Sequence, residues 1–516
     1  MYNFKTLLSG IAISSLLLVS SCGDSKTESQ TANTPEFNIL ASIKNPAAFT
    51  SVNLMELLAK SNIENSKDLP GQIKMMVNSQ ISQHLNSKAQ GLKLEGNIPF
   101  VITANEDGSF KSVVSVFEVL DAKKVGSSLC LYFGGKVQKE ENISILKGMI
   151  PGSEETLFFV WDDKQLVSVY AENGAKDEAL ALLNSKAIDS PENEKLSSFL
   201  NNHNDFSSLV FMDTYTNISN VLSQTKMDQE LMDAYKGVTV EASANFNKGD
   251  FTFTSNLEGE NFTASKYNSV NENTVNKSFL NYLTIDNKAI MYGTASLNLD
   301  ALINIAEQTD SEGINYENEL TKIGIKKEDI TKILTGEFAL SLLDIEYVKV
   351  MHGDNFSYED QPKYVLTCWI KDAELLKESL SKNSDVKVVN NYYAVEETFI
   401  GIYDNKLFAS LSESLIESLV NGSQLTAPNL SGNNPLYGNI VSDMNQLPEN
   451  YKKLLLAEGG EEVLKIYNEI ESIQFTGDIH NTQFKLKLKD DSKNAFEVFS
   501  NTLIKNLLPL ILGGMI

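Results

Sequence analysis

The sequence predicts an α+β protein made of two tandem copies of a similar unit, with antiparallel sheets and helices packed on one face. Three observations lead to this fold class. Several segments recur in the same order in the two halves, and hairpin signals alternate with helical patterns. The composition is also globular, with 42% hydrophobic residues, 25 Phe and 18 Tyr in 516 residues. A chain of this length is expected to form two to four domains.

The opening segment of the unit occurs twice. Residues 51–54 (SVNL) match residues 296–299 (SLNL), and each segment follows a β-prone run. Further along, Gly96 in LEGNIPF matches Gly336 in LTGEFAL, again leading into an alternating strand. Because the matches keep their order, they indicate an internal repeat.

The longest match contains no gap. EETLFFVWDDKQLVSV, from residue 154, aligns with EETFIGIYDNKLFASL, from residue 396. A weaker match pairs FSSLVFMD at 206–213 with LYGNIVSD at 436–443. We therefore predict an internal duplication in which Trp161 superposes on Tyr403 and Asn53 on Asn298.

Four polar residues mark predicted helix starts. Asn53, Asp121, Asn298 and Asp372 each stand where an apolar strand gives way to a pattern of 3.6-residue period. A side-chain oxygen at such a position accepts a hydrogen bond from the first turn of the helix, which stabilises the helix by about 1 kcal/mol. We interpret these residues as N-caps rather than as acid–base groups.

Short polar runs between strand-like segments predict hairpin turns at 162–164, 404–406, 105–108 and 247–250. Helices are predicted at about 173–184 and 412–420. Each half closes with a hairpin, VTVEASANF with DFTFTSNLEG in the first and SIQFTGDIH with QFKLKLKD in the second. Hairpins interleaved with helices are typical of antiparallel sheets that carry helices on one face.

The N-terminus predicts export and lipidation. Lys5 precedes an apolar run at 7–19, and Val19-Ser20-Ser21 places small residues directly before Cys22. The run is too short for a stable membrane-spanning helix. Acyl chains such as palmitate on the Cys22 thiol and on the freed amine would anchor the mature protein stably to a membrane. We expect the outer membrane, on its periplasmic face or at the cell surface.

The predicted organisation is a lipoprotein signal peptide at 1–21, a flexible tether at 22–36, a first unit at 37–262, a linker at 263–277 and a second unit at 278–516. The second unit is predicted to end in a C-terminal helix that packs on it. The buried residues of this helix are expected to be Phe496, Phe499, Leu503, Ile504 and Leu507. Its last ten residues, LLPLILGGMI, are too few to span a bilayer.

Charge restricts the possible partners. The formal net charge is −25, and all 43 basic residues are lysine, because the sequence contains no arginine. Such a polyanion repels nucleic acid, which excludes nucleic-acid binding as the function. The absence of the planar guanidinium also disfavours forked recognition of anionic small molecules.

No sequence motif predicts an enzyme, a cofactor or a metal site. The nucleophile elbow, the zinc-protease helix, the C-x-x-C pair, the phosphate loop and the EF-hand are all absent, and His84, His203, His352 and His480 are scattered. Cys130 and Cys368 are expected to be small buried hydrophobes, although an exported protein could bridge them. The sequence thus favours a non-catalytic binding or scaffolding protein of the cell envelope. The alternative is a hydrolase of an envelope polymer or glycan whose site is assembled from distant residues.

One segment is a candidate ligand loop. MHGDNFSYEDQPK, from residue 351, lengthens one hairpin of the second half relative to its counterpart in the first. Loops commonly carry function, and oxygen, imidazole and aromatic groups here could hold a glycan, a peptide or a divalent ion. An ordinary solvated hairpin extension is the alternative. The candidate residues are His352, Asp354, Phe356, Tyr358, Glu359 and Asp360.

The lipidation motif, the tether, the S-V-N-L-x-x-L-L segment and the mid-chain L-T-G-E-F-A-L-S-L resemble a family of uncharacterised Bacteroidota lipoproteins, domain of unknown function 4836 (DUF4836). The chain length and the helix after K-D-D-S-K-N-A-F fit as well. The sequence departs from the family pattern at 44–48, where KNPAA replaces a proline–acidic–alanine turn. The resemblance covers nearly the whole chain and implies topology and cell location, without a catalytic motif.

Overall fold

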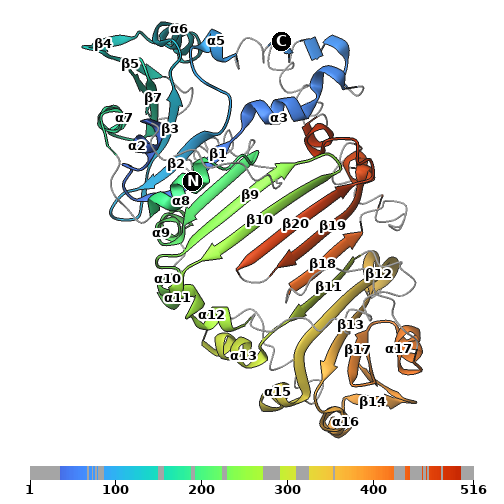
Figure 1. Cartoon of the computed structure of the whole chain (residues 1–516). Coiled ribbons are helices and arrows are strands. Elements are labelled where there is room, and N and C mark those ends of the chain that lie inside the picture. Colours follow the sequence, from blue (N-terminus) through green and yellow to red (C-terminus); the bar gives the residue numbers. More distant parts are fainter. Residues whose placement is uncertain are drawn as a thin grey trace. The chain divides into compact units, whose positions relative to one another are not determined.

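The computed structural model describes residues 35–66, 69–72, 74–75, 78–79, 86–148, 156–186, 192–223, 229–270, 291–308, 325–352, 355–422, 436–441, 452, 456, 461, 464–477 and 480–500. The chain divides into two compact units (Figure 1). The first contains the described residues up to Thr263 together with those from Asp490 onward, and the second runs from Ala264 to Lys489. In this described part of the chain, no helix is both long and apolar enough to cross a membrane.

The first unit is built on one antiparallel sheet. Its strands are β1 (Pro46–Val52), β2 (Ile98–Ala104), β3 (Phe110–Glu118), β4 (Gln138–Glu140), β5 (Ile143–Gly148), β6 (Thr156–Trp161), β7 (Gln165–Ala171), β8 (Phe206–Phe211), β9 (Thr239–Phe246) and β10 (Asp250–Glu258). They are hydrogen-bonded in the order β10-β9-β8-β1-β2-β3-β7-β6-β5-β4. Its helices are α2 (Pro35–Leu40), α3 (Leu54–Ser61), α5 (Ser87–Gln90), α6 (Ala122–Phe133), α7 (Ala175–Leu183), α8 (Glu192–Leu200), α9 (Met212–Ser223), α10 (Gln229–Ala234) and α11 (Glu260–Thr263), with a 3₁₀ turn at Ile63–Asn65.

The second unit is also built on one antiparallel sheet. Its strands are β11 (Met291–Ser296), β12 (Leu334–His352), β13 (Asn355–Ile370), β14 (Val386–Val389), β15 (Tyr392–Val395), β16 (Thr398–Tyr403), β17 (Lys406–Ser410), β18 (Leu436–Val441), β19 (Ile470–Gly477) and β20 (Asn481–Leu488). Their order is β20-β19-β18-β11-β12-β13-β17-β16-β15-β14. Position by position, this is the strand order of the first unit. Its helices are α12 (Lys266–Ser269), α13 (Leu299–Gln308), α15 (Ile330–Ile333), α16 (Ala373–Lys382) and α17 (Glu413–Val420), with a 3₁₀ turn at Lys327–Asp329.

All four predicted N-caps are confirmed. The Asn53 and Asn298 amide oxygens each accept a backbone N–H at 3.2 Å, from Glu56 and Ala301 respectively. The Asp121 carboxylate accepts from two backbone amides at the start of α6. Asp372 accepts from one backbone amide at the start of α16. Each helix therefore begins at the residue that the sequence indicated.

The core of the first unit lies between the sheet and helices on both of its faces. On β7, Leu166 packs with Val125 and Leu129 of α6. The next residue, Val167, packs with Ala175 and Ala179 of α7. Because neighbouring strand residues point to opposite faces, α6 and α7 cover opposite faces of the sheet. The expectation that the helices pack on one face is therefore wrong here.

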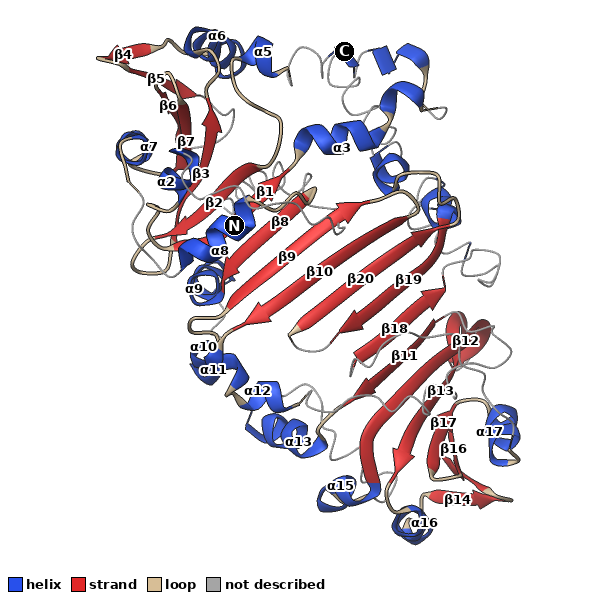
Figure 2. Ribbon diagram, viewed as in Figure 1, coloured by secondary structure: helices blue, strands red, loops and turns tan. Residues whose placement is uncertain are grey.

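The second unit has the same arrangement around β17. Leu407 packs against the cluster that contains Leu376 and Leu380 of α16. Its neighbour Phe408 packs with Ile416 of α17. Figure 2 shows α16 and α17 beside this strand group. Helices therefore cover both faces of this sheet as well.

The predicted superposition of Trp161 on Tyr403 is shifted by one residue. Trp161 is 1% exposed and packs beneath α6, whereas Tyr403 is 48% exposed. Ile402 packs against the α16 cluster instead, and Ile402 pairs with Leu407 as Trp161 pairs with Leu166. A shift of one residue moves a strand side chain to the other face. The ungapped alignment matched the similar turns DDK and DNK and so missed this register.

The C-terminal segment packs on the first unit, which corrects the prediction that it completes the second. The Phe496 and Phe499 rings lie 4.7 and 6.1 Å from the Phe246 ring of β9. The Asn494 side chain donates to the Phe246 carbonyl at 2.9 Å, and Ala495 N–H donates to the Asn247 carbonyl at 3.0 Å. The stripe pattern identified Phe496 and Phe499, which are half-buried, but could not indicate which sheet they meet. Leu503, Ile504 and Leu507 lie outside the described residues.

The remaining boundaries differ less from the prediction. Part of the predicted linker at 263–277 is structured, because it contains α12, and Val270 accepts a hydrogen bond from Asn298 N–H. Lys406, predicted to lie in a turn, begins β17 and is 2% exposed. The helices expected at about 173–184 and 412–420 and the two closing hairpins are confirmed.

Candidate functional site

The predicted lipidation residue, Cys22, and residues 22–34 of the tether lie outside the described residues. The structure begins at α2, whose Ile39 and Leu40 are already buried in the core of the first unit. The sequence alone therefore supports the lipid anchor at Cys22.

The candidate ligand loop is formed by two paired strands. Tyr347 faces Asp360, Lys349 faces Tyr358 and Met351 faces Phe356, and the register runs unbroken over residues 344–352. His352 ends β12, Glu359 lies within β13, and Asp354 lies outside the described residues. The backbone of the described candidate residues thus belongs to a long two-stranded ribbon. The loop was predicted from the polar composition of this segment. A two-stranded ribbon can have the same composition.

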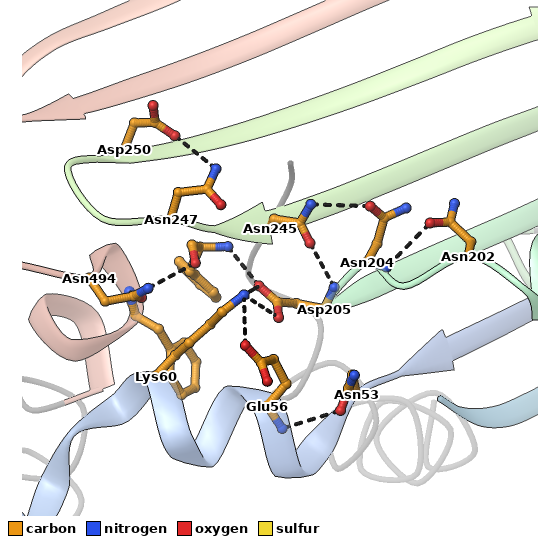
Figure 3. Close-up of polar contacts among 12 residues, drawn as sticks. Asn53, Glu56, Lys60, Asn202, Asn204, Asp205, Asn245, Asn247, Asp250 and Asn494 are labelled. Carbon is orange, nitrogen blue, oxygen red and sulfur yellow. Dashed lines mark hydrogen bonds and ion pairs between the residues drawn. The ribbon is translucent and has the colours of Figure 1, made fainter. Parts of the chain in front are cut away.

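The most strongly enclosed charge in the described part of the first unit belongs to Asp205, just before β8 (Figure 3). Its side chain is 1% exposed. Lys60 of α3 donates to both carboxylate oxygens, at 2.7 and 2.8 Å. The backbone N–H of Phe246 donates to one of them at 2.8 Å. A buried carboxylate is tolerated only when it is paired and hydrogen-bonded in this way.

The backbone of Asp205 is fixed as well. Its N–H donates to the Asn245 side chain at 2.8 Å, and its carbonyl accepts from Asn53 N–H at 2.8 Å. Asn245 in turn donates to the Asn204 side chain at 3.1 Å. We call Asn53, Lys60, Asn204, Asp205, Asn245 and Phe246 the Asp205 junction, because they join the ends of β1, β8 and β9 to α3.

The junction and the adjoining Asn62 also contact the segment that contains Asn494 and Glu497. Phe246 accepts from Asn494 through its carbonyl, and the Asn62 side chain donates to the Glu497 carboxylate at 3.1 Å. Segments more than 400 residues apart in sequence therefore meet beside α3.

Burial raises the pKa of Asp205 above its ordinary value of 3.8, and the hydrogen bonds from Lys60 and Phe246 oppose that shift. Glu56, which lies 3.6 Å from Lys60, adds a smaller effect in the raising direction. A raised carboxyl pKa in a cleft would suggest a general acid. Here the carboxylate is 1% exposed and accepts from Lys60 and from Phe246 N–H, so we interpret it as a structural ion pair.

Sequence reasoning missed this pair. Lys60 and Asp205 are separated by 145 residues, and neither belongs to a known motif. A comparison of the two halves of the sequence nevertheless distinguishes both residues. Under the alignment of 51–54 with 296–299, Ile305 stands in place of Lys60, and under the weaker match Pro435 stands in place of Asp205. Both charges are therefore absent together from the second half.

A second candidate surface is one face of the sheet formed by β8, β9 and β10. In register, Ser208 faces Ala242 and Ala242 faces Ser255, while Val210 faces Val240. With Phe253, these six side chains lie on one face, and each is half-exposed. We call Ser208, Val210, Val240, Ala242, Phe253 and Ser255 the open face.

Helices border the open face at the two ends of its strands. β1 ends at Val52, opposite the start of β8, and α3 follows there, whereas α9 follows the other end of β8. Figure 2 shows α3 at one end of these strands and α9, α10 and α11 at the other.

The remaining candidates are dispersed. Among the described residues, no three His, Cys, Asp or Glu side chains gather as metal ligands. Of the histidines, His203 and His480 belong to different units, and His84 lies outside the description. Cys130 and Cys368 are free thiols, and burial raises the pKa of Cys368 to about 12. Cys368 fits the predicted buried hydrophobe, and Cys130 is half-buried.

Comparison with known proteins identifies no family. No protein-family model matches the chain, and no curated protein matches it. Two solved structures of the protein TP0453 show a limited similarity. Crystal form III has a TM-score of 0.27 and 8% identity, and covers 43% of this chain and 78% of that one. Crystal form I has a TM-score of 0.25 and 10% identity, and covers 45% and 81%. Similarities of this size carry no argument about function.

Proposed function

We propose that the protein is an exported lipoprotein, anchored through acyl chains on Cys22, whose body has a non-catalytic binding or scaffolding role in the cell envelope. The observation that carries the proposal is the sequence Val19-Ser20-Ser21-Cys22 after a basic residue and a short apolar run. Two or more acyl chains at one residue suffice for stable anchoring. The resemblance to the DUF4836 lipoproteins points to the same location, and we propose the outer membrane.

We further propose that the body arose by duplication. Strand order is the same in the two units, and the N-caps Asn53 and Asn298 open corresponding helices. The shared pairing of Trp161 with Leu166 and of Ile402 with Leu407 supports the same origin. An experimental structure in which Ile402 and Trp161 occupy unrelated positions would overturn this proposal.

A binding role agrees better than hydrolysis with the enclosed charge. Asp205 combines burial with a raised pKa, yet its carboxylate is occupied by Lys60 and Phe246. A general acid must reach the leaving group of its substrate at hydrogen-bond distance. An envelope polymer cannot approach this group without displacing the ion pair. A partner of the body is expected to be a neutral or cationic glycan, peptide or envelope protein, because the chain has no arginine and a net charge of −25.

Replacement of Cys22 tests the anchor. In cells fed a labelled palmitate, the parent should incorporate the label and sediment with outer membranes, whereas Cys22→Ala should lose the label. Exchange of residues 1–22 for an ordinary cleavable secretory signal should release the body into the soluble periplasmic fraction. Cys130→Ala is the matched control and should remain labelled and bound. If the unlabelled body stays with the membranes, another segment is the anchor.

A further inference from the structure

Helix α6 of the first unit exposes apolar side chains to solvent. Leu131, near the end of the helix, is 70% exposed, and Tyr132 beside it is 39% exposed. Leu120, directly before the N-cap Asp121, is 52% exposed. Among the described residues, no large hydrophobic side chain is more exposed than Leu131. Single exposed apolar residues are ordinary on a protein surface, so the groups around these three decide whether they form an interaction surface.

The helix carries lysines and no acidic residue. Lys123 and Lys124 are both exposed. The Lys124 ammonium group donates to the Lys88 carbonyl at 2.9 Å, which places α5 and the exposed Lys88 beside α6. The Asp121 carboxylate lies 3.9 Å from Lys124, but it also accepts from two backbone amides of the helix that it caps. In a chain with a formal net charge of −25, α6 therefore forms a local basic surface.

The lysines and the apolar side chains share the same rows of the helix. Residues four apart in a helix are neighbours, so Lys123 and Leu131 belong to one row and Lys124 and Tyr132 to the next. The Tyr132 hydroxyl accepts from the Gln90 side chain of α5 at 3.0 Å. Each row thus begins with a lysine and ends with an apolar or aromatic side chain. We call Leu120, Lys123, Lys124, Leu131 and Tyr132 the α6 surface.

The corresponding helix of the second unit has a different surface. α16 begins after the N-cap Asp372 and packs against β17 as α6 packs against β7. Glu374 pairs with Lys377 at 2.8 Å, and Glu378 pairs with Lys382. The same element therefore carries ion pairs in one unit and an apolar, basic surface in the other, so packing on the sheet does not explain the α6 surface. Counted from the two N-caps, Leu120, Lys123, Ser127 and Leu131 correspond to Lys371, Glu374, Glu378 and Lys382.

The predicted tether is long enough to bring α6 to the membrane. Pro35 lies thirteen positions after Cys22, and such a segment extends to at most about 45 Å. α2 begins at Pro35 and packs through Ile39 and Leu40 on the same face of the sheet as α7, whereas α6 covers the other face. Because packed layers lie about 10 Å apart, α2 and α6 are separated by about 20 Å across the sheet. Acyl chains on Cys22 and the α6 surface can therefore enter the same leaflet.

We propose that the α6 surface docks on the phospholipid leaflet that holds the Cys22 acyl chains, an inference that rests on the proposed lipid anchor. The ammonium groups of Lys123 and Lys124 meet headgroup phosphates, and Leu131 enters the boundary of the acyl region. Tyr132 combines an apolar ring with a hydroxyl that stays at the level of the headgroups. The contact is small, so it depends on the high local concentration that the tether provides. Docking determines which side of the first unit faces the membrane.

Quenching of tryptophan by brominated lipid tests the docking. The mature chain, with Cys130→Ala, is coupled through Cys22 to a maleimide lipid in vesicles of phosphatidylethanolamine and phosphatidylglycerol. Leu131→Trp should lose about half of its added fluorescence when the acyl chains are brominated, because bromine quenches an indole that it contacts. Lys382→Trp, at the corresponding position of α16, is the matched control and should keep its fluorescence. Equal quenching of the two variants, or quenching of neither, would overturn the proposal.

Charge reversal tests the role of the lysines. Adding Lys123→Glu and Lys124→Glu to Leu131→Trp should restore most of the lost fluorescence, because carboxylates are repelled by phosphatidylglycerol. Quenching that survives the charge reversal contradicts the proposal. Since the coupling to lipid is chemical, the result does not depend on lipidation in cells, which the palmitate label tests separately.

A second measurement leaves the α6 surface unsubstituted. Acetic anhydride should acetylate Lys123 and Lys124 about fivefold more slowly in the vesicle-coupled chain than in the free chain. Lys377 of α16 should react at the same rate in both. Protection of Lys123 and Lys124 on isolated outer membranes but not on the protein-free vesicles would assign the α6 surface to a protein partner and overturn the proposal.

Discussion

Asp205 and Lys60 show how a single pair of side chains fixes a junction between distant segments. The carboxylate receives donors from α3 and β9, and the backbone of the same residue is bonded to Asn53 and Asn245. Each donor offsets part of the cost of enclosing a charge. Loss of one partner should therefore cost more than the pair contributes in net stability, because the other charge stays enclosed.

Lys60→Met should reveal this asymmetry. The substitution keeps an apolar stem and removes the ammonium group, and we expect the free energy of unfolding to fall by about 3 kcal/mol. Adding Asp205→Asn should recover part of that loss, because the amide is uncharged and still accepts from Phe246 N–H. Urea denaturation of the two single variants and the double variant measures the coupling.

The matched control is an exposed ion pair of the same unit. Lys93 and Glu118 lie 2.8 Å apart, with side chains 50% and 49% exposed. Lys93→Met should change the free energy of unfolding by less than about 0.5 kcal/mol. A loss of similar size in Lys60→Met would mean that the enclosed pair contributes no more than a surface pair.

At the scale of the element, two glycines have a similar backbone conformation but differ in how close their neighbours lie. Gly96 and Gly336, matched in the repeat, have φ values of +88° and +96°. A Cβ on Gly96 would meet nothing within 4 Å, whereas one on Gly336 would lie 2.0 Å from the Leu297 carbonyl oxygen. Gly336 lies at a register shift of β12, where the strand passes close to Leu297.

Gly336→Ala should therefore be far more disruptive than Gly96→Ala. We expect Gly96→Ala to cost about 1 kcal/mol, from the left-handed backbone alone. Gly336→Ala should cost about 2 kcal/mol or more beyond that, because backbone must move to relieve the contact. Thermal unfolding of both variants gives the comparison. Equal losses would show that the contact with Leu297 relaxes without cost.

Elements could be predicted from the sequence where the hydrogen bonds that fix them join residues close together in the chain. Asn53 and Asp121 cap helices through amides two or three residues away, and Asp162 closes its turn by accepting from Lys164 and Gln165 N–H. The Lys60–Asp205 pair and the contact of Phe496 with Phe246 depend on the tertiary arrangement of distant segments, which local periodicity does not specify. The one-residue error at Trp161 has a related origin, because identities within a turn do not fix the register of the strands around it.

At the scale of the whole molecule, the first unit is completed by the segment that follows the second unit, from Asp490 onward. Phe496 packs on Phe246, Asn494 donates to the Phe246 carbonyl, and Glu497 accepts from Asn62. The second unit, from Ala264 to Lys489, is therefore inserted between two pieces of the first.

Phe496→Ala should destabilise the first unit selectively. Removing this half-buried ring should cost about 2 kcal/mol, less than the loss of about 3–5 kcal/mol for a fully buried aromatic side chain. Hydrogen exchange should increase in α3 and β9 and stay unchanged in β16 and β17. Phe475→Ala, at a residue 37% exposed on β19 of the second unit, is the control and should leave α3 and β9 unaffected. Faster exchange confined to the second unit would contradict the assignment of this segment.

The insertion of one unit within the other sets an order for biosynthesis. Because a chain is synthesised from its N-terminus, the first unit emerges early but lacks its last piece until residues 490–500 follow. The second unit, continuous in sequence, is delivered whole before the first can close. A nonsense codon just after residue 489 would leave the second unit complete. The first unit would lack the segment from Asp490 onward, and quality-control proteases are expected to degrade it.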